Sequence, residues 1–176
     1  CIDSCGELKV KTLVCHVYIG FDTVARVTDI GIKNFSLLID EAEKYDLNLA
    51  FENTEGVECL YGIKEHLSHR KNCGFCIDTG HEFCYNAGYD LLKDFCDKLF
   101  FLHINDNMGV TGDRVFWTDD SHIIPFKHGK VNWQRFTSNL KTINWNGWIS
   151  LELGVKNKPN KYYYNESNGH HAAPCC

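Results

Sequence analysis

Five apolar runs in this sequence each end on a side chain that can bind a metal ion. The terminal residues are His16, Glu52, Asp78, His103 and Glu152. Carboxylates and imidazoles are common ligands of divalent metals in proteins. Parallel strands end at one edge of their sheet, where such sheets carry their active sites. The pattern therefore predicts a metal site built from the carboxyl ends of several parallel strands.

The ligands differ in how strongly their surroundings favour a functional role. Asp78 and His81 are three residues apart across a turn at Gly80, so both side chains can converge just beyond the strand. Glu152 lies between two leucines on a predicted interior strand, where a charge is costly unless it is paired or binds a metal. A lone histidine such as His103 is more often an ordinary core residue. Several buried ligands together favour metal binding.

Strands and helices alternate strictly along the chain. The apolar runs predict strands at 10–16, 48–52, 74–78, 99–104 and 148–153. Helical spacing predicts helices from Asp29 or Asn34 to about 45, at 58–70, from 90 onward, and after a cap at Asn132. A long loop is expected from 105 to about 130. This alternation indicates an α/β fold made of βα units and a parallel sheet.

Two α/β folds agree with this order. A (β/α) TIM barrel has eight strands and typically about 250 residues. In that fold the chain would be incomplete, holding about strands 4–8 and lacking three N-terminal βα units. Residues 1–156 would form the C-terminal part of the barrel as a single domain, and 157–176 a polar tail. An open doubly wound sheet is the alternative, and it would need nothing missing.

Composition excludes some classes of function. The chain is 44% hydrophobic and 23% charged, with a net charge of -5, which gives no support to a broad nucleic-acid-binding surface. No apolar run reaches the roughly 20 residues of a membrane span, and we expect a cytoplasmic protein. Of the ten cysteines, Cys15, Cys76 and Cys96 lie inside apolar or periodic segments, where a free cysteine behaves as a small hydrophobe. A zinc knuckle of Cys73, Cys76, His81 and Cys84 is a minor alternative.

Several short motifs follow one another in a specific order between residues 10 and 153. They are Phe-Glu-Asn-Thr at 51–54, Ile-Asp-Thr-Gly-His at 77–81, Leu-His-Ile-Asn-Asp-Asn at 102–107, Asp-Ser-His at 120–122 with Gly-Lys-Val-Asn-Trp at 129–133, and Ser-Leu-Glu at 150–152. This ordered set resembles the xylose isomerase-like TIM barrels, which include sugar and sugar-phosphate isomerases and epimerases and the apurinic-site endonucleases. The chain departs from the family at 16–18 and 125–129, both in loops expected to face the substrate.

The resemblance implies a divalent metal, Mn²⁺, Zn²⁺, Co²⁺ or Mg²⁺, bound by Glu52, Asp78, His103 and Glu152. Glu52 and Glu152 would be catalytic: one removes a proton from the sugar and the other returns it, through an enediolate. The residues His16, His81, Asp120 and His122 would bind substrate or additional metal. The partner would be a small-molecule sugar, with no membrane involved and a homo-oligomer left open.

Two other functions stay open at this point. An endonuclease-like phosphodiester hydrolase would use His16, His81, Asp120 and His122 as ligands of a two- or three-metal cluster. The acidic balance and the lack of Lys and Arg clusters in the loops make a nucleic-acid substrate the weaker expectation. The other open function is that of a relative that binds a sugar without turnover. In an isomerase, Phe83, Phe116 and Trp117 near the loops would form the wall of the pocket, and a place in the ordinary core is the equal alternative for them.

Overall fold

A computed structural model describes residues 1–21, 25–112 and 119–154, so the predicted tail at 157–176 lies outside the described residues. The strands are β1 (Thr12–His16), β2 (Asn48–Glu52), β3 (Cys73–Asp78), β4 (Leu99–Ile104) and β5 (Trp148–Leu151). Each lies within two residues of its predicted bounds at either end. The apolar runs were therefore a sufficient signal for the strands, as they are in sheets buried on both faces.

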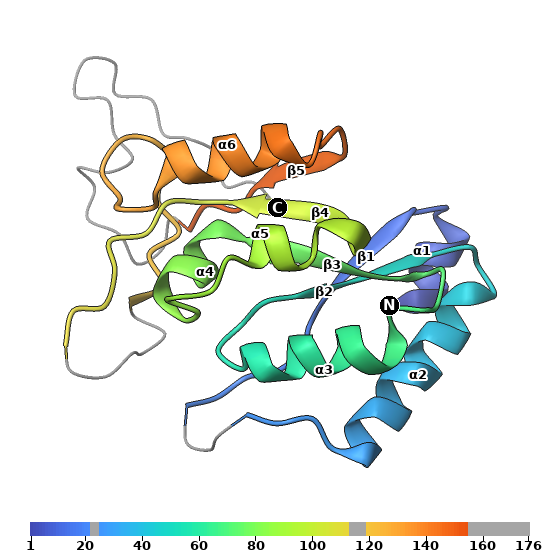
Figure 1. The fold of residues 1–176 in the computed structure, drawn as a ribbon. Helices are drawn as coiled ribbons and strands as arrows, with labels where there is room; N and C mark the ends of the chain where they lie inside the picture. The colour runs from blue at the N-terminus through green and yellow to red at the C-terminus, as the bar shows by residue number, and fades with distance from the viewer. Residues whose placement is uncertain (22–24, 113–118, 155–176) are drawn as a thin grey trace.

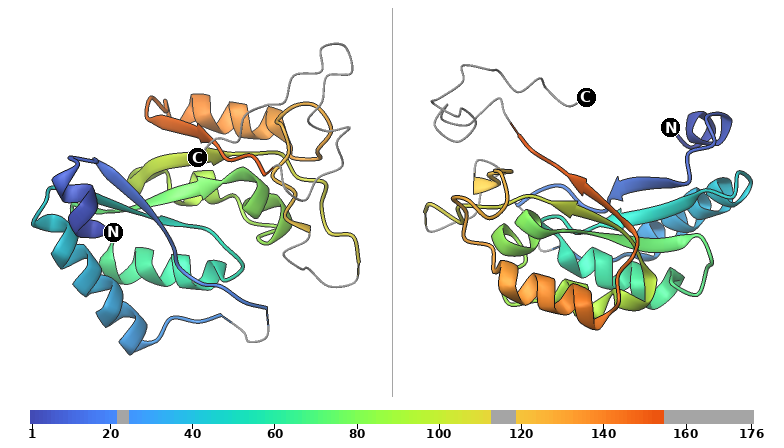
Figure 2. Two further views of the ribbon diagram at one scale, coloured as in Figure 1. Left: turned by 180° about the vertical axis from the view of Figure 1, so that it is seen from behind. Right: turned by 90° about the horizontal axis from the view of Figure 1, so that it is seen from above.

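The strands form one parallel sheet in the order β1-β2-β3-β4-β5, and the sheet curls as it goes (Figure 1). A doubly wound sheet reverses its strand order at a switch point, and no reversal occurs here. The helices α2, α3, α5 and α6 run along one face of the sheet (Figure 2). This is the arrangement of an incomplete TIM barrel, and the open doubly wound alternative is wrong.

Four predicted helices are present: α2 (Asp29–Glu43), α3 (Val57–Leu67), α5 (Leu91–Asp94) and α6 (Trp133–Thr142). Asn132 caps α6 as expected, accepting a hydrogen bond from the amide of Arg135 at 2.9 Å. The predicted caps of α2 were wrong, because Thr28 accepts the capping bond from Gly31. Three short helices were not predicted, namely α1 (Ile2–Glu7), α4 (Thr79–Cys84) and the 3-10 turn η1 (Cys96–Lys98).

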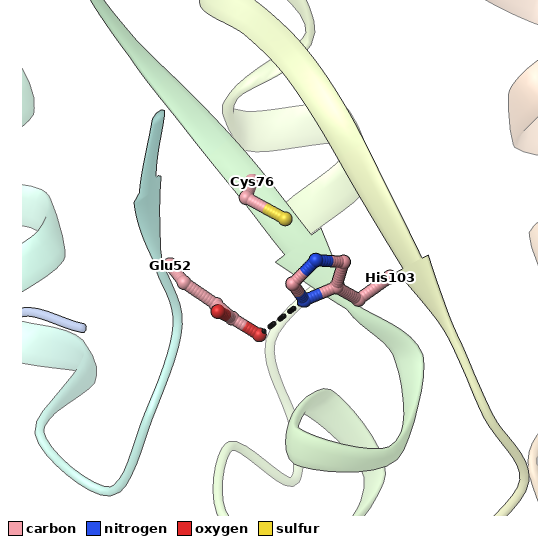
Figure 3. Close-up of side chains that lie close together, drawn as sticks. All are labelled: Glu52, Cys76 and His103. Atoms are coloured by element: carbon pink, nitrogen blue, oxygen red, sulfur yellow. Dashed lines mark hydrogen bonds and ion pairs between the residues drawn. The ribbon is translucent and has the colours of Figure 1, made fainter. Parts of the chain in front are cut away.

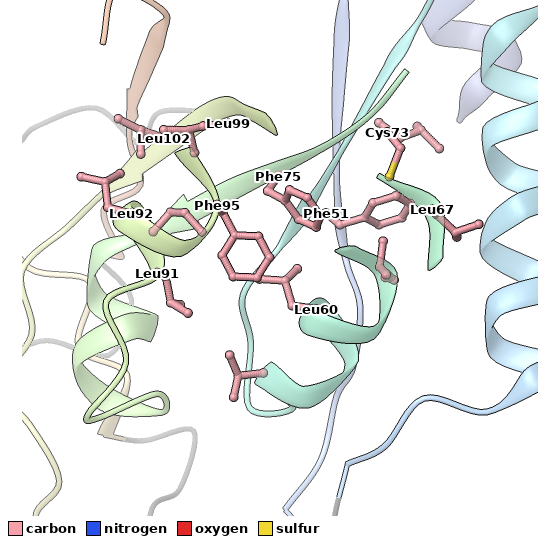
Figure 4. Packing of buried hydrophobic residues seen from close by; sticks show 14 of the residues in the cluster. Phe51, Leu60, Leu67, Cys73, Phe75, Leu91, Leu92, Phe95, Leu99 and Leu102 are labelled. Carbon is pink, nitrogen blue, oxygen red and sulfur yellow. The ribbon is translucent and has the colours of Figure 1, made fainter. Parts of the chain in front are cut away.

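The hydrophobic core lies between the sheet and its helices (Figure 4). Phe51 of β2 and Phe75 of β3 are fully buried there, and Phe51 contacts Phe35 of α2 edge-on. Successive side chains of a strand point to opposite faces. Glu52 and Cys76, which follow these two phenylalanines, therefore face the concave side of the sheet, away from the helices.

The two outermost strands leave apolar side chains open to solvent. Within the described residues, β1 pairs only with β2, and β5 only with β4. Trp148, Ile149 and Leu151 of β5 are 75%, 52% and 61% exposed. Unpaired, apolar strands of this kind favour association with further strands.

Two expectations from composition can be checked within the described residues. None of the helices there is long and apolar enough to cross a lipid bilayer. No disulfide joins any two of the eight cysteines described. Cys73 lies in the hydrophobic core, whereas Cys76 faces the opposite side of the sheet, and no zinc knuckle forms.

Candidate metal centre

The strand ends bring four of the predicted ligands together. Glu52 ends β2, Asp78 ends β3, His103 lies on β4 beside Asp78 in register, and Glu152 directly follows β5. One ligand atom from each of these residues lies within 4.8 Å of the others. The convergence expected from the sequence is therefore present, while the metal-binding role of the four residues stays a prediction.

The contacts of His103 leave one carboxylate oxygen of the site without a hydrogen bond. The Nδ1 atom of His103 is 2.9 Å from Glu52 Oε1 and 2.8 Å from Glu152 Oε2. One N–H cannot serve both acceptors, and Glu152 Oε2 is a buried oxygen with no hydrogen-bond partner. A divalent cation among these three side chains would satisfy that oxygen, so the residues fit a metal ion.

Asp78 is completely buried and has a second, structural task. Its Oδ1 atom accepts a hydrogen bond from the amide of His81 at 2.7 Å and so caps α4. Its Oδ2 atom accepts one from Asn105 Nδ2 at 2.6 Å. The expected turn at Gly80 is thus wrong, because α4 begins here. Gly80 is needed for another reason: a Cβ at this position would lie 1.9 Å from Asn105 Oδ1.

His81, Asp120 and His122 form a second group whose ligand atoms lie within 4.8 Å of one another. Each histidine places Nδ1 2.9 Å from a backbone carbonyl, that of Asn53 for His81 and that of Glu152 for His122. Since a carbonyl only accepts, Nδ1 carries the proton in both rings. Both Nε2 atoms face Asp120 Oδ2, at 3.1 and 2.8 Å. Histidines that bind metals are typically oriented in this way.

The remaining predicted residue, His16, belongs to neither group. Its Nε2 atom lies 3.4 Å from Glu52 Oε2, and its side chain is 48% exposed. It lines a cavity of about 250 Å³ together with Thr54, His81, Tyr85 and Asp120. A larger cavity of about 1030 Å³ lies between α2 and α3 and holds none of the predicted ligands. The smaller cavity is therefore the candidate substrate site.

Burial and neighbouring charges shift the pKa values of the site's carboxyl groups in different directions. Burial opposes ionisation of Glu52, but hydrogen bonds from His103 and His16 outweigh it and lower the pKa of Glu52 to about 2. The interaction with His103, whose Nδ1 lies 2.8 Å from Glu152 Oε2, also lowers the pKa of Glu152. Burial raises the pKa of Asp78 to about 6, although nearby His81 opposes the shift. At neutral pH both glutamates are ionised, as metal binding and proton abstraction require.

Sequence reasoning missed two buried amides that hold the ligands in place. Asn53 Oδ1 accepts a hydrogen bond from the amide of Asp78 at 2.7 Å, and the backbone carbonyl of Asn53 accepts one from His81 Nδ1 at 2.9 Å. Asn105 is bonded to Asp78, and its backbone exchanges hydrogen bonds with Thr79 Oγ1. Each asparagine directly follows the last residue of a strand, and this position was the only signal available in the sequence.

The predicted aromatic wall is not supported by the described residues. Phe83 lines a different cavity, beside Glu82 and Arg135. Phe116 and Trp117 lie outside the described residues. Among the described residues, aromatic rings beside the predicted site residues are instead Tyr85, whose centroid lies 5.3 Å from that of His81, and Phe101, whose centroid lies 5.6 Å from that of His103.

Comparison with known proteins shows what this chain is similar to. The chain is 27% identical over 133 residues to the probable endonuclease 4 of Bacillus subtilis strain 168, covering 64% of this chain and 44% of that protein. It is 29% identical over 124 residues to the inosose isomerase of Halalkalibacterium halodurans, covering 66% and 43%. The chain thus spans less than half the length of these relatives.

The fold also matches solved structures. The crystal structure of IOLI protein with a bound zinc atom superposes with a TM-score of 0.70 at 22% identity, covering 92% of this chain and 59% of the other. The family model of the xylose isomerase-like TIM barrel matches residues 1–170. Family members of this kind include epimerases, isomerases and endonucleases. From the fold, the convergence of its strand ends and this match, the chain belongs to the xylose isomerase-like TIM barrel family.

Proposed function

We propose that the chain is part of a divalent-metal-dependent isomerase or epimerase that acts on a sugar or sugar phosphate. The observation that carries the proposal is the placement of Glu52 and Glu152. They reach His103 from β2 and from the end of β5, two elements separated by β3 and β4. Two carboxylates facing one centre from separate strands are what proton removal and proton return on different faces of a substrate require.

Each residue of the site has its own role in the proposed reaction. A bound divalent cation would polarise the sugar carbonyl and its neighbouring hydroxyl. Glu52, Asp78, His103 and Glu152 would hold it, since their ligand atoms lie within 4.8 Å of one another. One glutamate takes the proton from the carbon next to the carbonyl, which gives an enediolate of the sugar. The other glutamate returns a proton to carbon, and His81 orients a substrate hydroxyl.

Hydrogen exchange at carbon provides the test. We expect the full-length, metal-loaded protein to incorporate deuterium from D₂O at the carbon next to the carbonyl of a ketose or aldose, detected by NMR over a panel of sugars. Glu52→Gln and Glu152→Gln should each lower the exchange by at least about 100-fold, the usual contribution of general acid–base catalysis. Glu58→Gln, which alters an exposed glutamate of α3, is the control. If both variants exchange hydrogen as fast as the wild type, the proposal is contradicted.

A phosphodiester hydrolase is the second candidate, and one observation favours it. His81, Asp120 and His122 could hold a further metal, with both Nε2 atoms turned toward Asp120. The curated relatives also include proteins named probable endonuclease 4. Against it, the residues that line the candidate substrate cavity include two histidines, Glu55 and Asp120 but no lysine or arginine. A phosphate backbone is bound chiefly by such cations.

Metal content separates the two candidates. We expect the double variant Asp120→Ala/His122→Ala of the full-length chain to keep one tightly bound metal and to lose activity on sugars only in part. The measurement is metal per chain by elemental analysis, alongside assays on ketoses and on abasic DNA. Two or more metals in the wild type, one of them lost in the double variant, together with nicking of abasic DNA, would replace the isomerase by the hydrolase.

A further inference from the structure

Cys76 is a thiol in the candidate metal centre that the proposed reaction does not use. It lies on β3 directly beside Glu52 in the register of β2 and β3. It lies two positions before Asp78 along β3, so both side chains lie on the concave face of the sheet. Cys76 is completely buried. Its side chain therefore lies further from the carboxyl-terminal edge of the sheet than that of Asp78.

The sulfur is directed at the centre. Figure 3 shows the side chains of Glu52, Cys76 and His103 pointing toward one another from three neighbouring strands. His103 Nδ1 is hydrogen-bonded to Glu52 Oε1 at 2.9 Å. One ligand atom from each of the three residues lies within 4.8 Å of the other two. A carboxylate, a thiol and an imidazole thus converge at one point.

We propose that Glu52, Cys76 and His103 form a second metal position that is selective for thiophilic cations such as Cd²⁺ and Zn²⁺. Thiolate ligands favour soft cations, whereas oxygen ligands suit Mg²⁺ and Mn²⁺. Three protein ligands with one open place agree with the tetrahedral geometry of zinc. As the metal–sulfur bond forms, the S–H bond of Cys76 breaks and its proton passes to solvent.

Sharing of ligands makes the two positions mutually exclusive. Glu52 and His103 belong both to this group and to the group that contains Asp78 and Glu152. A cation drawn to the sulfur takes these two side chains from the oxygen-rich position. Thiophilic cations are therefore inhibitors of any activity that needs Mn²⁺ or Mg²⁺ at that position, and Cys76 determines which metals support turnover.

The test is a cadmium titration of the full-length, metal-free, reduced protein. Cadmium bound to thiolate gives an ultraviolet charge-transfer band, and we expect a saturable band in the wild type that Cys76→Ser abolishes. Cys73→Ser is the matched control, since Cys73 is an equally buried thiol of β3 that faces the hydrophobic core. It should keep the band. No band in the wild type, a band that persists in Cys76→Ser, or a band also lost in Cys73→Ser would each overturn the proposal.

Two further measurements keep the result independent of the proposed reaction and of variant folding. Asp78→Asn/Glu152→Gln removes the ligands that the sulfur position does not use, so it should keep the cadmium band even where turnover is lost. In the wild type, X-ray absorption of bound cadmium should show one sulfur among its ligands. A ligand shell without sulfur, or loss of the band in Asp78→Asn/Glu152→Gln, would overturn the proposal.

Discussion

His81 is buried among carboxylates, and this determines how its charge responds to pH. Burial opposes protonation, but Asp78 and Asp120 outweigh it and raise the pKa of His81 from 6.5 to about 10 in the metal-free protein. A group whose pKa is raised on folding contributes stability that is fully present below its unfolded pKa. This contribution is lost as the pH rises from 6.5 through about 10.

The first prediction follows from this sign. In the presence of a chelator, His81→Gln should lower the free energy of unfolding most at pH 6 and least near pH 10, as measured by urea denaturation across that range. His66→Gln, on an exposed position of α3, is the control and should show no such trend. A constant difference between wild type and His81→Gln at every pH would contradict the electrostatic account.

The second prediction concerns Asn105, which donates a hydrogen bond to Asp78 Oδ2 at 2.6 Å. Removing an amide that orients a metal ligand typically costs about 10–100-fold in metal affinity. We therefore expect Asn105→Ala to weaken Mn²⁺ binding by that amount in isothermal titration calorimetry. Asn139→Ala is the control. It removes a side-chain amide of α6 that donates to Asp90, and the variant should bind Mn²⁺ as the wild type does. Unchanged affinity in Asn105→Ala would argue that Asp78 is held by other contacts.

The residues that sequence reasoning found and those it missed differ in charge. Glu52 and His103 were identifiable because a charged or titratable group at the end of an apolar strand is costly without a partner. Asn53 and Asn105 carry no charge, and their partners Asp78 and Thr79 lie 25 and 26 residues away. No local pattern reveals such contacts, which exist only once β2, β3 and β4 are side by side.

Short elements were missed for a related reason. The helix α4 has only six residues, too few for an apolar periodicity to be read from the sequence. Its start is fixed by the carboxylate of Asp78, which had been assigned to metal binding alone. A residue that both caps a helix and faces a metal site gives two signals at one position, and either can hide the other.

The third prediction separates these two tasks of Asp78. Asparagine is a good N-cap, so Asp78→Asn should keep α4 but lose the charge that binds metal. Asp78→Ala loses both, and we expect it to be less stable than Asp78→Asn by about 0.5–2 kcal/mol in the presence of a chelator. Urea denaturation measures the difference, and calorimetry with Mn²⁺ should show no binding in either variant. Equal stability of the two variants would mean that the cap contributes nothing.

At the scale of the whole molecule, the exposed face of β5 predicts association. Ile149 and Leu151 are 52% and 61% exposed on a strand that has a single neighbour within the described residues. We expect the 176-residue chain by itself to self-associate or to lose structure with dilution, as measured by sedimentation velocity over a range of concentrations. Ile149→Lys/Leu151→Lys should reduce the association, since charge on an edge strand opposes pairing.

A matched control tests whether β5 is responsible. Ile30 is 72% exposed but lies on α2 rather than on β5, so Ile30→Lys should leave the association unchanged. A chain that stays monomeric and melts cooperatively at all concentrations would contradict this prediction. The strand order itself was predictable from the alternation of strands and helices, whereas the degree of edge exposure became visible only in the structure.

The loop that carries Asp120 and His122 is joined to both ends of the site. Ile123 exchanges backbone hydrogen bonds with Asp106 just after β4, and His122 accepts one from the amide of Gly154 after β5. The side chain of His122 also donates to the carbonyl of Glu152, 30 residues away. These contacts require both strands to be in place, so we expect this part of the site to be completed late in folding.

Late completion has a kinetic consequence. Interactions that form after the rate-limiting step of folding leave the folding rate unchanged and act on the unfolding rate alone. We therefore expect Mn²⁺ to slow the unfolding of the full-length protein at least about tenfold while changing its refolding rate by less than about twofold, as measured by stopped-flow fluorescence. Refolding accelerated by metal would mean that the ligands meet early. If they meet late, a newly made chain folds first and acquires its metal afterwards, and the cell's supply of the ion limits activity rather than folding.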